Sequence, residues 1–132
     1  MAVVCGIYAV KKGLDPPIEK VVKENQAELM EIVETILENK TISGYSSYKG
    51  FRILYSHEYN DMILFGKAAG GFGSETCYKG FYYSPNDQPL SSQGEGYTAT
   101  PEGEEWHWSD GTDNWSYTER IMENWFSFSE HW

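Results

Sequence analysis

The stretch that decides the fold is GEEWHWSDGTDNWSYTERIMENWFSFSEHW, residues 103–132, which contains all five tryptophans of the 132-residue chain. Large aromatic side chains gain the most free energy on burial, so this segment is expected to supply much of the core. Ser116 and Glu119 fit the S-x-x-E capping box, which favours a helix start. Apolar residues then recur at spacings of four and three, namely Tyr117, Ile121, Trp125, Phe128 and Trp132. This periodicity predicts a C-terminal aromatic helix from Ser116 to His131.

The end of this segment allows a second interpretation, because Phe126 and Phe128 alternate with serines. Aromatic residues favour sheets, and a period of two is typical of a half-buried strand. A strand over Trp125–Ser129 is therefore the alternative to the helix. Upstream, the alternation in Glu105–Ser109 predicts a short strand, and Asp110-Gly111 after it predicts a turn.

The residues before this segment predict a first strand, a long helix and further strands. Ala2–Val10 is a short apolar run typical of a strand. Asp15-Pro16-Pro17 predicts a helix start with Asp15 as the N-cap, and the helix is expected to continue to about Asn39. An apolar stripe supports this helix through Ile18, Val22, Leu29, Val33 and Ile36. The next strands are expected at Phe51–Tyr55, Met62–Phe65 and Thr76–Ser84, the first two as a hairpin.

Together these elements predict an α+β fold, in which a long helix from the N-terminal half and the C-terminal aromatic helix pack on an antiparallel β-sheet. The length suits a single domain over residues 1–132. Residues 85–103 are rich in Pro, Gly, Ser and Gln. They predict a long surface loop, and function is one usual reason for such a loop.

The negative charge is unevenly distributed along the chain. Residues 1–80 contain ten acidic and nine basic residues, whereas residues 81–132 contain ten acidic residues and only Arg120 as a base. Nine of the ten net negative charges therefore belong to the last 52 residues. Such a surface argues against binding nucleic acid or an anionic membrane and favours a basic or cationic partner. It is equally consistent with acids that keep an aromatic-rich surface soluble.

Cysteine usage predicts the compartment. Cys5 and Cys77 both lie in apolar, strand-like surroundings, so both are expected to be buried, reduced thiols. The first residues lack the basic and apolar regions of a signal peptide, and no apolar run reaches transmembrane length. A cytoplasmic location is therefore expected.

No motif in the chain fixes a reaction. The cluster Gly70, Gly71 and Gly73 has neither of the spacings that cradle nucleotide phosphates. The three histidines lack the spacing of a metal site. A triad of Cys77, His107 and an acid has no local signature. No catalytic residue, metal ligand or cofactor is assigned, and an enzyme is the third choice.

The leading hypothesis is a small, acidic, non-enzymatic protein that masks a basic surface on a partner protein. By size and charge it is analogous to immunity proteins and phage-encoded inhibitors of host defence. Acidic residues would steer association and aromatic residues would anchor it. The expected binding residues are Glu102, Glu104, Glu105, Trp106, Trp108, Asp110, Asp113, Tyr83 and Tyr97.

The alternative hypothesis is a ligand-binding module, with a nucleotide or a cation held in an aromatic pocket under the 85–103 loop. Aromatic rings near carboxylates can hold a cation or stack on a base. A homo-oligomer remains open in either case.

Overall fold

The computed structural model describes residues 17–58, 60–70, 77–90, 100–102, 105–109 and 115–131. The expected strand at Ala2–Val10 lies outside these ranges. Two helices come first, α2 (Ile18–Glu24) and α3 (Gln26–Asn39). The strands that follow are β1 (Ser47–Tyr48), β2 (Phe51–Ser56), β3 (Met62–Gly70), β4 (Cys77–Tyr83), β5 (Thr100–Glu102), β6 (Glu105–Ser109), β7 (Trp115–Met122) and β8 (Trp125–His131).

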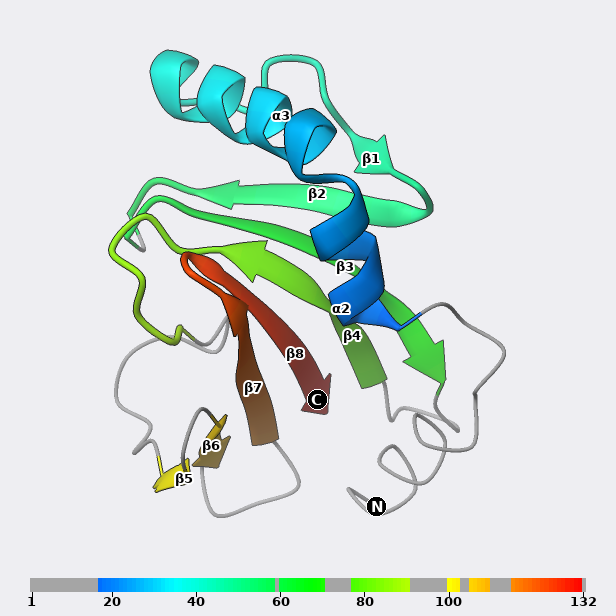
Figure 1. The fold of residues 1–132 in the computed structure, drawn as a ribbon, viewed down its shortest axis with the longest axis vertical. Coiled ribbons are helices and arrows are strands. Elements are labelled where there is room, and N and C mark those ends of the chain that lie inside the picture. The colour runs from blue at the N-terminus through cyan, green and yellow to red at the C-terminus, as the bar shows by residue number, and fades with distance from the viewer. Residues whose placement is uncertain are drawn as a thin grey trace.

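In the described residues the strands form one antiparallel sheet in the order β1-β2-β3-β4-β8-β7-β6-β5 (Figure 1). The sheet consists of two meanders, β1 to β4 and β5 to β8, which meet where β4 pairs with β8. The α+β class is confirmed. The expected strands in the middle of the chain and at Glu105–Ser109 are also present, with small differences at their ends.

The predicted C-terminal helix is wrong, because residues 115–131 form the β7–β8 hairpin. Glu123 and Asn124 make its turn, with Asn124 at a φ of 71° and Met122 paired with Trp125. Left-handed backbone is tolerated by asparagine better than by most residues, which favours this turn. The period-two alternation of aromatic and serine residues therefore outweighs the helical spacing. The rejected alternative, a strand beginning at Trp125, is the observed structure.

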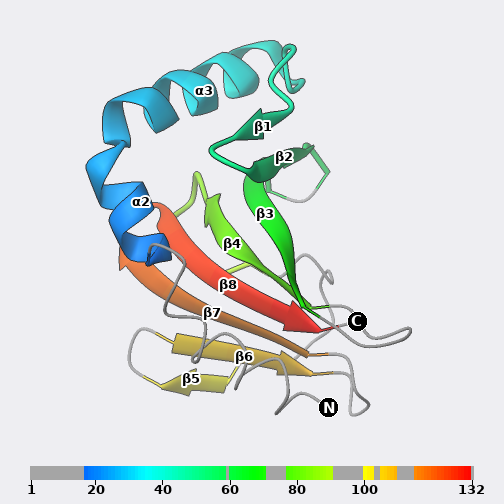
Figure 2. The ribbon, with the colours of Figure 1, turned by 90° about the vertical axis from the view of Figure 1, so that its right-hand side faces the viewer.

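The long N-terminal helix is interrupted at Asn25, which separates α2 from α3. The Asn25 side chain donates a hydrogen bond to the carbonyl oxygen of Val21 at 2.8 Å. The Asn25 backbone nitrogen donates to the carbonyl oxygen of Val22 at 3.4 Å. An asparagine that bonds its own backbone competes with helix continuation. Pro17 occupies the N-cap position of α2, where Asp15 was expected. Figure 2 shows the resulting bend between the two helices.

The helices cover one face of the sheet, called here the helix side. Its core includes the predicted helical stripe, with Val22, Leu29, Val33 and Ile36 at 0% exposure. From the sheet, Phe65 stacks on Phe81 with ring centroids 4.7 Å apart, and Trp125 packs beside both rings. Burial of such large side chains stabilises the fold by roughly 2 kcal/mol each. The expectation that the C-terminal segment supplies core residues is thus confirmed for Trp125.

The opposite face, called here the open side, has its own smaller core. Tyr82 stacks on Phe126 with centroids 5.3 Å apart, and Leu90 covers them from the segment after β4. The other buried members of this cluster are Met62, Leu64 and Phe128. Successive residues of β4 and β8, such as Phe81 and Tyr82 or Trp125 and Phe126, therefore enter the two opposite cores.

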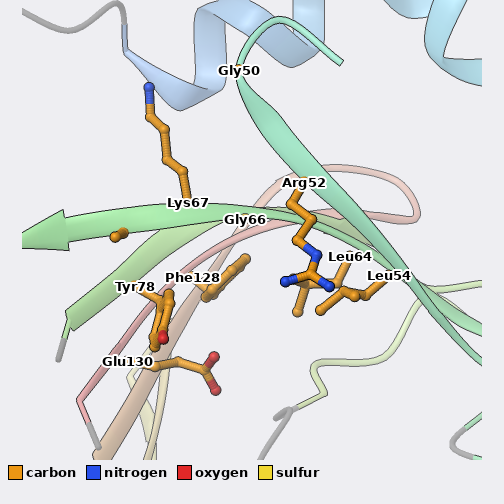
Figure 3. A pocket seen from close by; sticks show the side chains of 10 residues that line it. Gly50, Arg52, Leu54, Leu64, Gly66, Lys67, Tyr78, Phe128 and Glu130 are labelled. Carbon is orange, nitrogen blue, oxygen red and sulfur yellow. The ribbon is translucent and has the colours of Figure 1, made fainter. Parts of the chain in front are cut away.

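Two glycines face each other at the centre of the sheet, Gly66 on β3 and Gly80 on β4. A Cβ atom on Gly80 would lie 1.9 Å from the carbonyl oxygen of Phe65, which no side chain can tolerate. Gly80 permits this close approach of two backbones. The pairing of β3 with β4 also contains a register shift, which lies between Ala68 and Gly70. On the open side the missing side chains leave a hollow beside Phe128 (Figure 3).

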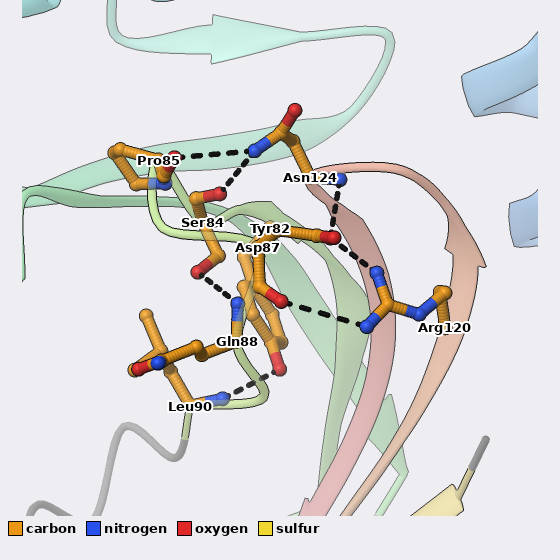
Figure 4. Close-up of polar contacts among 8 residues, drawn as sticks. All are labelled: Tyr82, Ser84, Pro85, Asp87, Gln88, Leu90, Arg120 and Asn124. Atoms are coloured by element: carbon orange, nitrogen blue, oxygen red, sulfur yellow. Dashed lines mark hydrogen bonds and ion pairs between the residues drawn. The ribbon is translucent and has the colours of Figure 1, made fainter. Parts of the chain in front are cut away.

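The segment after β4 is fastened to the β7–β8 turn by polar contacts (Figure 4). Asp87 Oδ1 accepts hydrogen bonds from the Arg120 guanidinium and from the backbone nitrogen of Asn124, the latter at 2.8 Å. The Asn124 side chain donates to the carbonyl oxygen of Ser84 at 2.9 Å. The hydrogen bond from the Asn124 backbone, with Arg120 beside it, lowers the pKa of Asp87.

A second set of hydrogen bonds fixes the end of this segment over the open side. The backbone nitrogen of Leu90 donates a hydrogen bond to the Tyr82 hydroxyl at 2.9 Å. The same Tyr82 hydroxyl lies 2.8 Å from the Thr118 hydroxyl. Thr118 donates its own proton to the carbonyl oxygen of Ser127 at 2.6 Å, so Tyr82 is the donor to Thr118. Residues 84–90 are therefore packed down on the sheet, whereas residues 91–99 of the predicted loop lie outside the described residues.

Cys77 is part of a disulfide bond, so the predicted reduced state of this thiol is wrong. The prediction for Cys5 lies outside the described residues. The expected cytoplasmic location relied on reduced thiols, and that argument no longer supports it. In the described part of the chain, none of the helices combines the length and apolarity needed to cross a membrane.

Replacing Gly80 by alanine is expected to destabilise the protein by roughly 3 kcal/mol, because the added methyl group meets fixed backbone. Gly66→Ala is the matched control. Its Cβ would meet only the side chains of Leu64 and Phe128, at 3.0 and 3.1 Å, and these can shift. Urea unfolding of the two variants measures the difference, and equal losses would contradict the close approach at Gly80.

Asp87→Asn is expected to lower the free energy of unfolding by about 1 kcal/mol at pH 7, a modest value because the side chain is 38% exposed. The pKa of Asp87 is lower in the folded state, so its contribution is present above the unfolded pKa of about 3.9 and is lost as the pH falls. Denaturation curves at pH 7 and pH 3 should show a smaller difference at the lower pH. An equal difference at both pH values would mean that the charge of Asp87 is not responsible.

Candidate functional site

One cross-strand row on the helix side changes from apolar to acidic residues along its length. Residues paired across an antiparallel sheet share a face. The row runs from β2 to β5 through Ile53, Phe65, Phe81, Ser127, Glu119, Glu105 and Glu102. Its first half is apolar and lies under the helices, and its last three positions are all glutamate.

We call Glu102, Glu105 and Glu119 the acidic row. β5 and β6 lie beyond the helices, so this end of the helix side is not covered by α2 or α3 (Figure 2). Glu19 at the start of α2 is close enough for its negative charge to act on Glu119. The arrangement thus brings the carboxyl groups of Glu105, Glu119 and Glu19 near one another, from two strands and one helix.

The acidic row repels itself. The pKa of Glu119 is raised, first by partial burial, then by a hydrogen bond with Glu105 and by the charges of Glu105 and Glu19. Like charges directly opposite each other on neighbouring strands destabilise a sheet by up to about 1 kcal/mol. A cation placed here would relieve the repulsion.

The predicted binding residues separate into different places. Glu102 and Glu105 belong to the acidic row. Trp106 lies on the open side, where its ring packs edge-on against Phe126 at 6.0 Å. Trp108 is paired with Ser116 in the register of β6 and β7. Tyr83 lies at the edge of the helix-side core, with its ring 5.1 Å from that of Trp125.

The remaining predicted residues, Glu104, Tyr97, Asp110 and Asp113, lie outside the described residues. Glu105 and Trp106 do not share one binding surface, because successive residues of β6 point to opposite faces of the sheet. A partner bound at Glu105 would therefore not contact Trp106 on the same face.

Glu119 was missed by sequence reasoning. The predicted helix would not place Glu119 opposite Glu105, because only a strand at residues 115–122 pairs with β6. The necessary signal was the alternation on both sides of Glu123-Asn124, which indicates a hairpin and brings residues 115–122 beside Glu105–Ser109.

A second titratable cluster lies in the turn between β2 and β3. Asp61 accepts hydrogen bonds from the Tyr55 hydroxyl at 2.5 Å and from His57 Nδ1 at 2.9 Å. These bonds, that of Tyr55 first, lower the pKa of Asp61. His57 is exposed, and all three residues belong to one short hairpin. The cluster therefore holds the turn together.

Among the described residues, no three His, Cys, Asp or Glu side chains are grouped so that they could hold a metal ion. Comparison with protein-family models, curated proteins and solved structures finds no match to this chain. The acidic row is therefore interpreted from its own geometry.

Replacing Glu119 by glutamine is expected to stabilise the protein at pH 7 by up to about 1 kcal/mol, because the amide removes a charge and can still donate to Glu105. The folded-state pKa of Glu119 is raised, so ionisation destabilises the wild type progressively as the pH rises above about 4. The advantage of the variant should therefore grow from pH 4 to pH 8 in urea unfolding.

Glu31→Gln on the exposed face of α3 is the control for this experiment and should show no comparable trend. A Glu119→Gln protein that is less stable than the wild type at pH 7 would show that the acidic row is not under electrostatic tension.

Proposed function

We propose that this protein is a small, acidic, non-enzymatic binding protein that masks a basic surface of a partner protein, as immunity proteins and inhibitors of host defence do. The observation that carries the proposal is the acidic row, in which Glu105 and Glu119 lie directly opposite each other on neighbouring strands and the pKa of Glu119 is raised. A fold that only needed solubility could separate these charges. Their opposition across two strands instead favours a positively charged group from outside.

Basic side chains of the partner would interact with the row in a defined way. A lysine or arginine between Glu105 and Glu119 forms charge-assisted hydrogen bonds with both carboxylates. It also turns a repulsion into two attractions, so the partner gains more than an isolated surface ion pair would give. The net charge of -10 would raise the association rate through long-range attraction.

The experiment uses a fluorescently labelled deca-arginine peptide as the basic probe. Glu105→Gln/Glu119→Gln is compared with Glu31→Gln/Glu38→Gln, which removes the same charge from the exposed face of α3. The row variant is expected to bind about tenfold more weakly than the wild type, equivalent to about 1.4 kcal/mol. The control variant should change affinity by less than about twofold, because its charges are distant and screened over about 10 Å at 0.1 M salt.

Fluorescence anisotropy at two salt concentrations gives these affinities. Equal losses in the two variants would mean that only net charge matters, and the proposal would then fail. Full binding by the row variant would place the interface elsewhere.

The alternative of a pocket under the 85–103 loop stays a prediction. In the part of that segment which is described, Leu90 is 7% exposed and fills the space over Tyr82. Residues 91–99, which would cover the rest of such a pocket, lie outside the described residues.

A further inference from the structure

The hollow on the open side of the sheet has the form of a ligand site. It has a volume of about 450 Å³ and lies over β2, β3, β4 and β8 (Figure 3). Ligand pockets typically have volumes of roughly 300–1,000 Å³. It faces away from the helices, so it is separate from the acidic row.

Gly66 lies in the lining of this hollow. One cross-strand row on the open side reads Arg52, Gly66, Gly80 and Phe128. Gly66 therefore places a position without a side chain between a guanidinium and an aromatic ring. Phe128 leans toward this position, because its Cζ atom would lie 3.1 Å from a Cβ on Gly66.

The walls come from the neighbouring rows. Leu54 and Leu64 pair on one side, and Tyr78 and Glu130 pair on the other. Leu54 is 50% exposed and Tyr78 is 39% exposed, which is unusual for large apolar side chains in this structure. A ligand of apolar character would remove this surface from water and gain roughly 25 cal/mol for each Å² buried.

Arg52 defines the polar end of the hollow. Its side chain is exposed and points toward Leu54 and Leu64 in Figure 3. Within the described part of the chain, its guanidinium forms no ion pair or hydrogen bond. A guanidinium offers a planar fork of donors that matches the two oxygens of a carboxylate. In a chain with one arginine besides Arg120, this group is placed where an anion can be recognised.

Glu130 sets the character of the opposite end. It is 4% exposed and brings a carboxyl group to the wall beside Tyr78. A second carboxylate on a ligand would lose its hydration against this buried wall, and removing a charged group from water costs free energy. The hollow therefore distinguishes ligands with one anionic end from ligands with two.

We propose that this hollow binds a small amphipathic monocarboxylate, with its carboxylate on the Arg52 guanidinium and its flat apolar body against the exposed side chain of Leu54. The body would lie above Leu64 and Phe128, which are buried and approach each other over Gly66, with its far end directed toward Tyr78.

The test uses three probes of one shape, 2-naphthoate, 2-naphthamide and 2,6-naphthalenedicarboxylate, titrated into the full chain by calorimetry. The naphthoate is expected to bind at least about tenfold more tightly than the other two, a difference of about 1.4 kcal/mol. Arg52→Gln should reduce naphthoate affinity to that of the amide. Lys20→Gln on α2 removes the same charge from the helix side and should leave naphthoate binding unchanged.

Amide NMR spectra locate the site, with shifts expected at Leu54, Tyr78 and Phe128. Glu105→Gln/Glu119→Gln should bind naphthoate normally, so failure here and failure of the acidic row are distinguishable. Absence of naphthoate binding up to millimolar concentration, equal binding of acid and amide, full affinity in Arg52→Gln, or shifts confined to other strands would each overturn the proposal.

Discussion

The pairing of β4 with β8 is the contact on which the rest of the structure depends. It joins a meander from the middle of the chain to one from its C-terminal end. Phe81 and Trp125 extend from these strands into the helix-side core, while Tyr82 and Phe126 extend into the open-side core. Gly80 lets β3 approach on the other edge of β4. The positions of the acidic row and of the hollow on the open side therefore both depend on how closely β3, β4 and β8 pack.

The helices divide the surface chemistry of the sheet. Where α2 and α3 cover the helix side, cross-strand rows are apolar, and beyond the helices the same row becomes glutamate. Part of the excess negative charge of the C-terminal half therefore lies in the acidic row. Among the residues that the structure describes, the open side carries no such row. It presents an apolar hollow with Arg52 at one end, so the two faces suit partners of opposite charge.

The sequence predicted the α+β class and the middle strands, because β-branched and aromatic runs bounded by turns carry a strong local signal. It failed at residues 115–131, where Ile121, Trp125 and Phe128 fit a helix while Phe126 and Phe128 fit a strand. Pairing with β4 decided between them, and such a long-range contact is not visible in local periodicity. The interruption at Asn25 was missed because the apolar stripe continues across it, although the asparagine side chain bonds the helix backbone there.

Only part of the candidate site could be predicted. Charge counting identified Glu102 and Glu105, since the C-terminal half holds the acidic excess. It could not identify Glu119, which joins them only through strand register. It also placed Trp106 beside Glu105, although alternation along β6 puts their side chains on opposite faces. Arg52 and its glycine neighbours gave no sequence signal, because the hollow arises from pairing across four strands.

The most direct measurement of the central claim is the pKa of the Glu119 carboxyl group, followed by carbon-detected NMR in the free protein and with saturating deca-arginine. The account predicts a pKa above the ordinary glutamate value in the free protein, because partial burial and then Glu105 and Glu19 oppose its ionisation. It predicts a fall in that pKa when the peptide binds, because basic side chains stabilise the ionised form. A pKa that is ordinary in the free protein, or one that the peptide leaves unchanged, would contradict it.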